Sequence, residues 1–500
     1  MKGLATAALT RRGLGARGGG DGRAPIPADA PAQAGIVHLG LGSFHRAHQA
    51  LYTARALQRE DGPWGIVGVA SRSRRITDAM RAQDGLYSVL ELGGDGSAPL
   101  VVGVHTELLV ATGEPLAVVN RLADRATRIA TLTVTENGYT ARSSTGALDT
   151  GLAQVRADLA GAPPSTTIGL LARGLQQRWR GHGEPMAIVS CDNVGRNGEH
   201  TRALVLEFVG LLPEPDAAEL RGWIERSLGF PSTMVDRIVP ATCDEHRARA
   251  DELLGLHDAA LVVAEPFSMW VLEDRFPAGR PRWEVAGAIF SDEVERYEQL
   301  KLRLLNATHS LIAYLGLLAG ARSIAQAIAR PEIRAAAEHV VHAELRPTLD
   351  APAQVDVAGY ADELFARFAN RAIDHRACQV ASDGSAKLAV RISAAVLRHT
   401  ARGSVPRGLA LTVAAYIRCL ATPGAYDAAG LGAIADPQRE RLEDLGAQAR
   451  DSRELVEAVF ELGIFAPAVA EASAFVAAVA ELHAVLVAHG HRAAIDAAIR

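Results

Sequence analysis

The sequence predicts an α/β protein with two domains, a doubly wound parallel sheet in the first half and a mostly α-helical second half. Short apolar segments alternate with helical patterns in the first half, and this alternation is typical of a parallel sheet covered by helices on both faces. A glycine-rich turn follows the first of these segments. After about residue 291, long stretches of Ala, Leu, Arg and Glu replace the alternation.

Four apolar segments are the predicted strands of the first domain. They are short, rich in Val and Ile, and bounded by glycine or polar residues, which is typical of buried strands. A helix is predicted over 168–180, between the third and fourth strands. The predicted strands are residues 35–40, 64–70, 129–135 and 186–190.

The second half contains helix-forming residues at helical spacing. Examples are residues 324–345, 409–420 and 466–489. The first 34 residues differ from both halves, since they combine Arg11-Arg12, a run of three glycines and several prolines. Such a composition is typical of a flexible, polar segment. We therefore expect a flexible leader over 1–34, a sheet domain over 35–287 and a helical domain over 288–500.

The overall composition gives no indication of a nucleic acid, membrane or thiolate-bound metal as a partner. The net charge is −5, which gives no reason to expect binding to nucleic acid or to an anionic membrane. No run of 18 apolar residues lacks charges, so no membrane span is expected. The four cysteines lie far apart in the sequence; this spacing fits a reducing compartment and favours a cytoplasmic location without a thiolate metal site.

The turn after the first strand contains Gly40 and Gly42 and should open a helix. This context favours a dinucleotide site of Rossmann type, in which the backbone N–H groups at the helix start bind a pyrophosphate. His45 stands where the third glycine of the usual motif would be. A purely structural turn is the alternative.

The segment after the second strand, residues 71–75, has no acidic residue to bind the ribose hydroxyls of NAD. It contains Arg72, Arg74 and Arg75 instead. Arginines here would suit the 2′-phosphate of NADP(H), so this cofactor stays open beside NAD(H). The alternative is a solvated basic loop.

A third motif runs from Lys301 to His309 and contains Asn306 between them. On an α-helix, Lys301 and His309 would lie about 80° apart, with Asn306 about 60° beyond His309. A lysine in partly apolar surroundings loses proton affinity and acts as a general acid or base near neutral pH. The alternative is a core helix with a lysine that reaches the surface and two satisfied polar groups.

Taken together, the motifs resemble the polyol-specific long-chain dehydrogenases, the family of mannitol dehydrogenase and fructuronate reductase. The resemblance covers roughly residues 35–490 and implies a Rossmann-type N-terminal domain, a helical C-terminal domain, and hydride transfer without a metal in the cleft between them. The motifs that carry it are GLGSFHRAHQ at 40–49, TVTENGY at 133–139, SCDN at 190–193, MVDRI at 234–238, EPF at 265–267 and the 301–309 run.

The resemblance also implies roles for single residues. Lys301 corresponds to the acid/base lysine, Asn193 and Asn306 to the pair that hydrogen-bonds the reacting oxygen, His309 to a residue that orients the substrate, and Asp236 to a supporting carboxylate. The expected cofactor-binding residues are Gly40, Gly42, Phe44, His45, Arg46, Arg72 and Glu136.

The segment 375–388 bears on the substrate. It has Gln379 where mannitol-type members usually have arginine, and Arg376 lies three residues earlier. This arrangement resembles the fructuronate reductases, which reduce a keto sugar acid to D-mannonate. A sugar acid needs a cation for its carboxylate, and the candidates are Arg376, Lys387 and Arg391; each is alternatively a salt-bridge partner. The residues at 388–390 and Arg371 depart from the family pattern, which bears on the pocket's shape.

Three other hypotheses stay open. Mannitol 2-dehydrogenase is the alternative within the family. Tyr297 and Lys301 also have the Tyr-x-x-x-Lys spacing of short-chain dehydrogenases, which would make Tyr297 the acid/base. A sugar or nucleotide sensor on a degraded scaffold is the third. In each case the partner is a small molecule, and we expect a monomer or a weak dimer.

Overall fold

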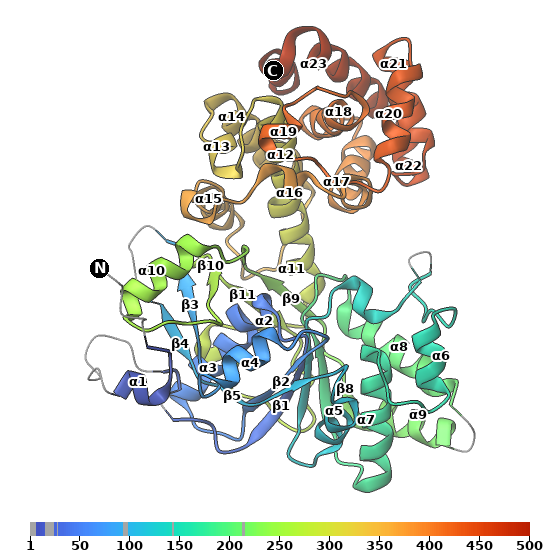
Figure 1. Ribbon diagram of the computed structural model, residues 1–500. Coiled ribbons are helices and arrows are strands. Elements are labelled where there is room, and N and C mark those ends of the chain that lie inside the picture. Colours follow the sequence, from blue (N-terminus) through green and yellow to red (C-terminus); the bar gives the residue numbers. More distant parts are fainter. Residues whose placement is uncertain (1–6, 16–24, 28, 94–98, 143–144, 213–215) are drawn as a thin grey trace. The chain divides into compact units, whose positions relative to one another are not determined.

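The computed structural model describes residues 7–15, 25–27, 29–93, 99–142, 145–212 and 216–500. The chain divides into two compact units, Met1–Glu295 and Arg296–Arg500 (Figure 1). The first unit contains the sheets, and the second is built from helices. The predicted fold class, a Rossmann-type N-terminal domain with a mostly α-helical C-terminal domain, is therefore confirmed.

The main sheet of the first unit has six strands in the order β5-β2-β1-β6-β7-β8, and every neighbouring pair is parallel. The four predicted strands are β1, β2, β6 and β7, at the centre of this sheet. The edge strands β5 and β8 were not predicted. The bounds are β1 Ala34–Leu39, β2 Gly65–Ala70, β5 His105–Val110, β6 Ile129–Leu132, β7 Met186–Ser190 and β8 Leu228–Gly229.

Side chains of the central strands alternate between two hydrophobic cores, as the period of two along a strand requires. Val37 and Leu39 of β1 point into a core shared with α5 (Pro115–Ala123), α7 (Thr167–Gly181) and α8 (Asn197–Gly210). Ile36 points into the other core, shared with α3 (Gln49–Arg59). Because both faces are covered, the strands read as continuous apolar runs.

Two three-stranded sheets and further helices complete the first unit. The sheet orders are β10-β3-β4 and β12-β11-β9. Their strands are β3 Tyr87–Glu91, β4 Leu100–Val102, β9 Thr233–Asp236, β10 Val262–Ala264, β11 Met269–Leu272 and β12 Ile289–Phe290. The remaining helices are α1 Arg11–Gly15, α2 Ser43–Ala47, α4 Arg75–Arg81, η1 Glu136–Tyr139, α6 Ala153–Leu159, α9 Asp216–Ser227, α10 Asp244–Leu254 and η2 Trp283–Ala286.

Part of the expected leader is ordered, which corrects the prediction of a flexible segment for residues 7–15. Leu9 is fully buried among Leu86, Val101, Leu254 and Leu256. Its N–H donates to the carbonyl oxygen of His257 at 2.8 Å. Burying a leucine side chain contributes about 2 kcal/mol to the free energy of unfolding. The contact was not predicted, because the composition of the segment is mostly polar. The predicted leader residues 1–6, 16–24 and 28 lie outside the described part of the chain.

The second unit packs its helices around α12 and α18, whose residues are almost all buried. Its helices are η3 Lys301–Ala307, α12 Thr308–Leu318, α13 Ile324–Ile328, α14 Pro331–His339, η4 Val340–Leu345, η5 Arg346–Thr348, α15 Val357–Phe368, η6 Arg371–Ile373, α16 Ala377–Ala381, α17 Gly384–Ala401, α18 Arg407–Ala421, α19 Ala428–Leu431, α20 Arg439–Gln448, α21 Ser452–Glu461, α22 Pro467–Ala470 and α23 Ser473–Ile499, with α11 Val294–Leu300 leading into them.

Among the residues that the structure describes, one helix, α23, is long and apolar enough by length and composition to cross a membrane. It is interrupted at Gly490, where φ is 78° and ψ is −178°. Phe475, Val479 and Leu482 on it are buried, and the helix packs along α18 and α21. These contacts give it the role of a core helix of the second unit.

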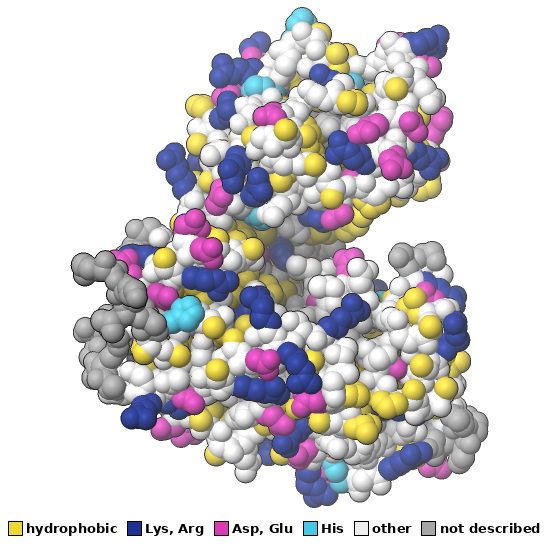
Figure 2. All heavy atoms as spheres, in the orientation of Figure 1, with side chains coloured by type: hydrophobic (Ala, Val, Ile, Leu, Met, Phe, Trp, Pro, Cys, Tyr) yellow, Lys and Arg dark blue, Asp and Glu magenta, His cyan; other side chains and the backbone are white. Residues whose placement is uncertain are grey.

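Positive and negative side chains are interspersed over the face of the molecule in Figure 2. Several charged side chains of the described residues form ion pairs one helical turn apart, such as Arg453 with Glu457 and Arg334 with Glu338. Exposed pairs of this kind contribute at most about 0.5 kcal/mol each. On this face, charge is spread out and does not form a continuous basic stripe.

Candidate active site

The glycine loop follows β1 and opens α2, as predicted. Gly40 has φ +106°, and a Cβ there would lie 2.1 Å from the carbonyl oxygen of Thr133, so glycine is required at this position. Gly42 is exposed, and a Cβ there would meet nothing closer than 3.6 Å. The loop thus leaves bare backbone at Gly42, which fits the close approach of a dinucleotide phosphate.

Three further predicted cofactor-binding residues, Phe44, His45 and Arg46, lie on α2 and are half-buried or buried. His45 has no exposed surface, and its Nε2 lies 3.1 Å from Nε2 of His105. The guanidinium of Arg46 is buried and donates to the carbonyl oxygen of Ala260. Phe44 is half-buried and stacks on His48. The side chains of His45 and Arg46 thus hold the loop from the interior, and their cofactor role stays a prediction.

Arg72 and Glu136 are exposed after the carboxyl ends of β2 and β6. Ligands of open α/β sheets bind at this edge, so both residues lie where the predicted cofactor role requires. Arg72, Arg74 and Arg75 are all exposed. The acid that would select NAD is absent from residues 71–75.

Asn193 is exposed just beyond β7, on the same edge of the sheet. Its neighbour Asp192 was not singled out in the sequence but organises this region. The Asp192 carboxylate accepts hydrogen bonds from the N–H groups of Val134 and Thr135, at 3.0 and 2.9 Å, and from the Tyr139 hydroxyl. These bonds end β6 at Leu132, three residues before the predicted end, and they join the loops after β6 and β7.

Asp236 is the last residue of β9 and is buried, with 3% of its surface exposed. The next residue, Arg237, is also buried and donates to the backbone oxygens of Ala47 and Glu265 and to the Glu91 carboxylate. This anchoring fixes the end of β9, and the side chain of Asp236 is thereby held in a defined place.

The Lys301–His309 run is helical, but residues 301–307 form a π-helix, η3, which was not predicted. In a π-helix each backbone hydrogen bond joins residues five apart, so residues five apart lie about one turn from each other. Lys301 and Asn306 therefore come onto one side of the helix, whereas an α-helix would separate them by about 140°. Both side chains are half-buried. Short π segments are frequent at functional sites.

His309 begins the buried part of α12 and is 8% exposed. Its ring lies 5.0 Å from those of Phe368 and His375, and its Nε2 is buried without a hydrogen-bond partner. Burial lowers the pKa of His309 well below 6.5, and nearby His375, Arg391 and Arg367 add to the effect. A neutral ring with one unsatisfied nitrogen is suited to bind a hydroxyl group of a ligand.

Arg391 on α17 reaches the same cluster. Its guanidinium donates to the Ser310 hydroxyl at 2.7 Å, and that hydroxyl donates to the backbone oxygen of Asn306 at 3.2 Å. Burial lowers the pKa of Arg391, yet an arginine stays charged. The second unit thus brings together Asn306, His309 and the half-buried guanidinium of Arg391.

The other two predicted carboxylate binders lie in different surroundings. Lys387 donates to the backbone oxygen of Ser382 and to the Asp383 carboxylate, at 3.0 and 3.2 Å; this local pair matches the alternative of a salt-bridge partner, and the substrate contact stays a prediction. Nη2 of Arg376 lies near Gly432, and its Nε is buried without a partner. Of the three, Arg391 is the cation beside His309.

Tyr297 does not have the surroundings of an acid/base group. It is 1% exposed, and its hydroxyl accepts a hydrogen bond from Gln354 at 3.2 Å. A buried, engaged hydroxyl is unsuited to proton exchange with a substrate. These contacts speak against the short-chain dehydrogenase hypothesis.

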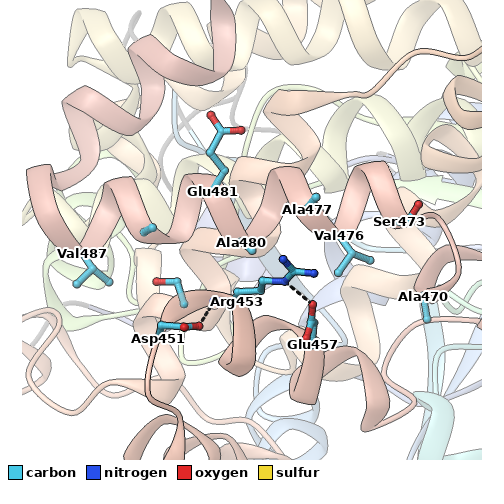
Figure 3. Close-up of a pocket in the computed structure, with 12 residues that line it drawn as sticks. Asp451, Arg453, Glu457, Ala470, Ser473, Val476, Ala477, Ala480, Glu481 and Val487 are labelled. Carbon is cyan, nitrogen blue, oxygen red and sulfur yellow. Dashed lines mark hydrogen bonds and ion pairs between the residues drawn. The ribbon is translucent and has the colours of Figure 1, made fainter.

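Two surface grooves were also found. The groove of about 880 Å³ in the second unit is lined by residues of α21, α22 and α23, and Figure 3 shows Arg453 bonded there to Asp451 and Glu457. The groove of about 910 Å³ in the first unit lies around β8 and Arg275. The lining residues of both include none of the predicted site residues, so neither groove has the chemistry of the candidate site.

Comparison with known protein families gives two matches. Residues 34–285 match the mannitol dehydrogenase Rossmann domain, and residues 293–486 match the mannitol dehydrogenase C-terminal domain. The chain belongs to the mannitol dehydrogenase family. The predicted family is therefore confirmed. As a member of this family, the protein is an oxidoreductase, and its Rossmann domain binds a nicotinamide cofactor.

Similar proteins support the same conclusion over most of the chain. "Uncharacterized oxidoreductase YeiQ" of Escherichia coli (strain K12) is 40% identical over 433 residues, covering 86% of this chain and 87% of the relative. D-mannonate oxidoreductase of the same organism is 38% identical, covering 86% and 88%. The solved structure of Pseudomonas fluorescens mannitol 2-dehydrogenase with NAD and D-mannitol is 34% identical, with a TM-score of 0.80 and coverage of 94% and 96%.

Proposed function

We propose that this family member interconverts D-fructuronate and D-mannonate with a nicotinamide cofactor. The observation that carries the proposal is the guanidinium of Arg391, which is half-buried, hydrogen-bonded to Ser310 and close to the neutral ring of His309. An arginine held in this way suits a carboxylate, because its planar fork forms two parallel charge-assisted hydrogen bonds. The similarity to D-mannonate oxidoreductase supports the same substrate.

The chemistry assigns a separate task to each residue. When bound, the nicotinamide supplies hydride to the ketone carbon or accepts it from the alcohol. The negative charge that develops on the substrate oxygen is stabilised by amide donors, for which we propose Asn193 and Asn306. Lys301 as an ammonium then gives its proton to that oxygen, and as a neutral amine it removes the proton in the reverse direction. His309 orients a substrate hydroxyl group, and Asp236 supports the polar network.

For the cofactor we propose NAD(H), with NADP(H) as the alternative. The similar mannitol 2-dehydrogenase was solved with NAD. The exposed arginines Arg72, Arg74 and Arg75 are the observation that favours NADP(H), since an arginine at this edge accommodates a 2′-phosphate. We also propose a cofactor domain over 35–287, a substrate domain over 288–500, a cytoplasmic location, and a monomer or weak dimer.

A matrix of substrates and cofactors tests the proposal. Fructuronate, fructose, mannonate and mannitol are each supplied with NAD(H) and with NADP(H), and the absorbance of the reduced cofactor is followed. We expect the highest kcat/KM with fructuronate and NADH. A clear preference for fructose would instead identify a mannitol 2-dehydrogenase. Cofactor binding without turnover of any substrate would identify a sensor.

Replacing Arg391 by Leu should lower kcat/KM for fructuronate by about 30-fold or more, because a charge-assisted hydrogen-bond pair contributes about 2–3 kcal/mol. Activity on fructose, which has no carboxylate, should change far less. The matched control is Arg398→Leu, the same change at an exposed position of α17. Equal losses on both substrates would show that Arg391 supports the fold of the site and does not bind the carboxylate.

A further inference from the structure

The carbonyl oxygen of Gly40, in the cofactor loop, is held by two side chains. The Thr133 hydroxyl donates to it at 2.8 Å, and Nε2 of His38 lies 3.1 Å from it and 2.9 Å from the Thr133 hydroxyl. Nδ1 of His38 lies 2.7 Å from the Thr131 hydroxyl. His38 belongs to β1 and the threonines to β6 and its end. The loop is therefore tied to both central strands by side chains.

These contacts favour one tautomer of the neutral His38 ring. With the hydrogen on Nε2, the ring donates to the Gly40 carbonyl oxygen, which only accepts, and Nδ1 accepts from Thr131. Burial lowers the pKa of His38 to about 3, and the ring is neutral at neutral pH. The ring is thus a fixed donor to the loop, with both nitrogens satisfied.

A second histidine fixes the other end of the loop. The ring of His45 stacks on that of His38 with 3.4 Å between centroids, and its Nε2 lies 3.1 Å from Nε2 of His105 on β5. Gly68 on β2 leaves the space for this pair, because a Cβ there would lie 3.0 Å from the His105 ring. Three imidazoles thus connect the loop to β1 and β5.

We propose that His38, Thr133 and His45 are positioning residues for the cofactor: they hold Gly40 and the start of α2 so that the backbone at Gly42 stays aligned with the bound dinucleotide. This explains why a histidine replaces the third glycine of the usual motif, since His45 fills the interior below α2 and makes its contacts there. The inference rests on the proposed cofactor role of Gly40 and Gly42, and it is independent of the sugar substrate.

The test uses the full-length protein and titration with NADH, or with NADPH if that is the better cofactor, followed by fluorescence. Thr133→Val removes the hydroxyl with little change of shape and should raise the Kd about 10-fold. Thr133→Ser keeps the hydroxyl and should stay within about twofold of the parent. His38→Leu should weaken binding at least as much as Thr133→Val, and His38→Gln, which restores a donor, should recover part of the loss. In all four, kcat at saturating cofactor should change by less than about threefold.

A control separates positioning from a general loss of stability. His483→Leu removes a buried histidine of the second unit, whose Nδ1 lies 2.9 Å from the Ser452 hydroxyl; it should leave the Kd unchanged. Gly42→Ala tests the loop itself. If Gly42→Ala weakens binding and Thr133→Val does not, the positioning proposal alone is wrong. If neither changes the Kd, the cofactor role of the loop is wrong as well.

Discussion

Replacing Lys301 by Ala is expected to lower kcat by about 100-fold or more while the Kd for reduced cofactor stays within about twofold. The reason is that proton transfer by a positioned group contributes about 10²–10⁴ to the rate. Lys301 lies on η3 in the second unit, whereas the glycine loop belongs to the first. Steady-state kinetics and a fluorescence titration on the same variant separate the two effects.

A matched variant sharpens this test. Tyr297→Phe removes a buried hydroxyl one turn earlier in the chain, and we expect turnover to change by less than about threefold. Small primary amines added to Lys301→Ala should restore part of the rate, because they replace the missing acid/base group. An unchanged rate in Lys301→Ala would exclude its role in proton transfer, and loss of activity in Tyr297→Phe would revive the alternative acid/base.

The two glycines of the cofactor loop should respond in opposite ways to the same substitution. Gly40→Ala forces a Cβ against the Thr133 carbonyl oxygen in a left-handed backbone conformation, and we expect it to lower the free energy of unfolding by about 3 kcal/mol or more. Gly42→Ala meets open space and should alter stability by less than about 0.5 kcal/mol. It should nevertheless weaken cofactor binding about 10-fold or more, since the methyl group occupies the approach of the phosphate.

Urea denaturation and cofactor titration of both variants distinguish these outcomes. Gly40→Ala should shift the midpoint of unfolding, whereas Gly42→Ala should shift the Kd alone. If Gly42→Ala destabilised the protein as much as Gly40→Ala, the loop would have a purely structural role.

The central strands could be predicted because they are covered on both faces and therefore read as unbroken apolar runs. The edge strand β8 has two residues, too few to give a pattern. The end of β6 was predicted three residues too late, because Asp192, almost sixty residues further on, takes the N–H groups that would continue the strand. Such an ending depends on a contact that is distant in sequence.

In the candidate site, too, features within a short segment could be predicted, whereas those that depend on residues far apart in the sequence could not. Lys301, Asn306 and His309 could be singled out because they are polar groups in a run with many leucines, and their roles stay predictions. The π-helical turn that places Lys301 and Asn306 on one side was not predicted. The composition does not show whether a backbone hydrogen bond joins residues five apart or four apart. The pairing of Lys387 with Asp383 depends on how α17 begins, so the sequence left open whether Lys387 is a salt-bridge partner or a substrate contact. His45 was predicted as a cofactor contact, and its partner His105 lies sixty residues away.

The π-helical turn at 301–307 has a consequence for how members of this family tolerate a change of length. Removing one residue between Leu302 and Leu305 would let the segment become an ordinary α-helix, in which Lys301 and Asn306 stand four residues and about 40° apart and so stay on one side of the helix. The hydrophobic interior of α12 would stay in register. Relatives whose sequences are one residue shorter here are therefore expected to keep the amine and the amide aligned.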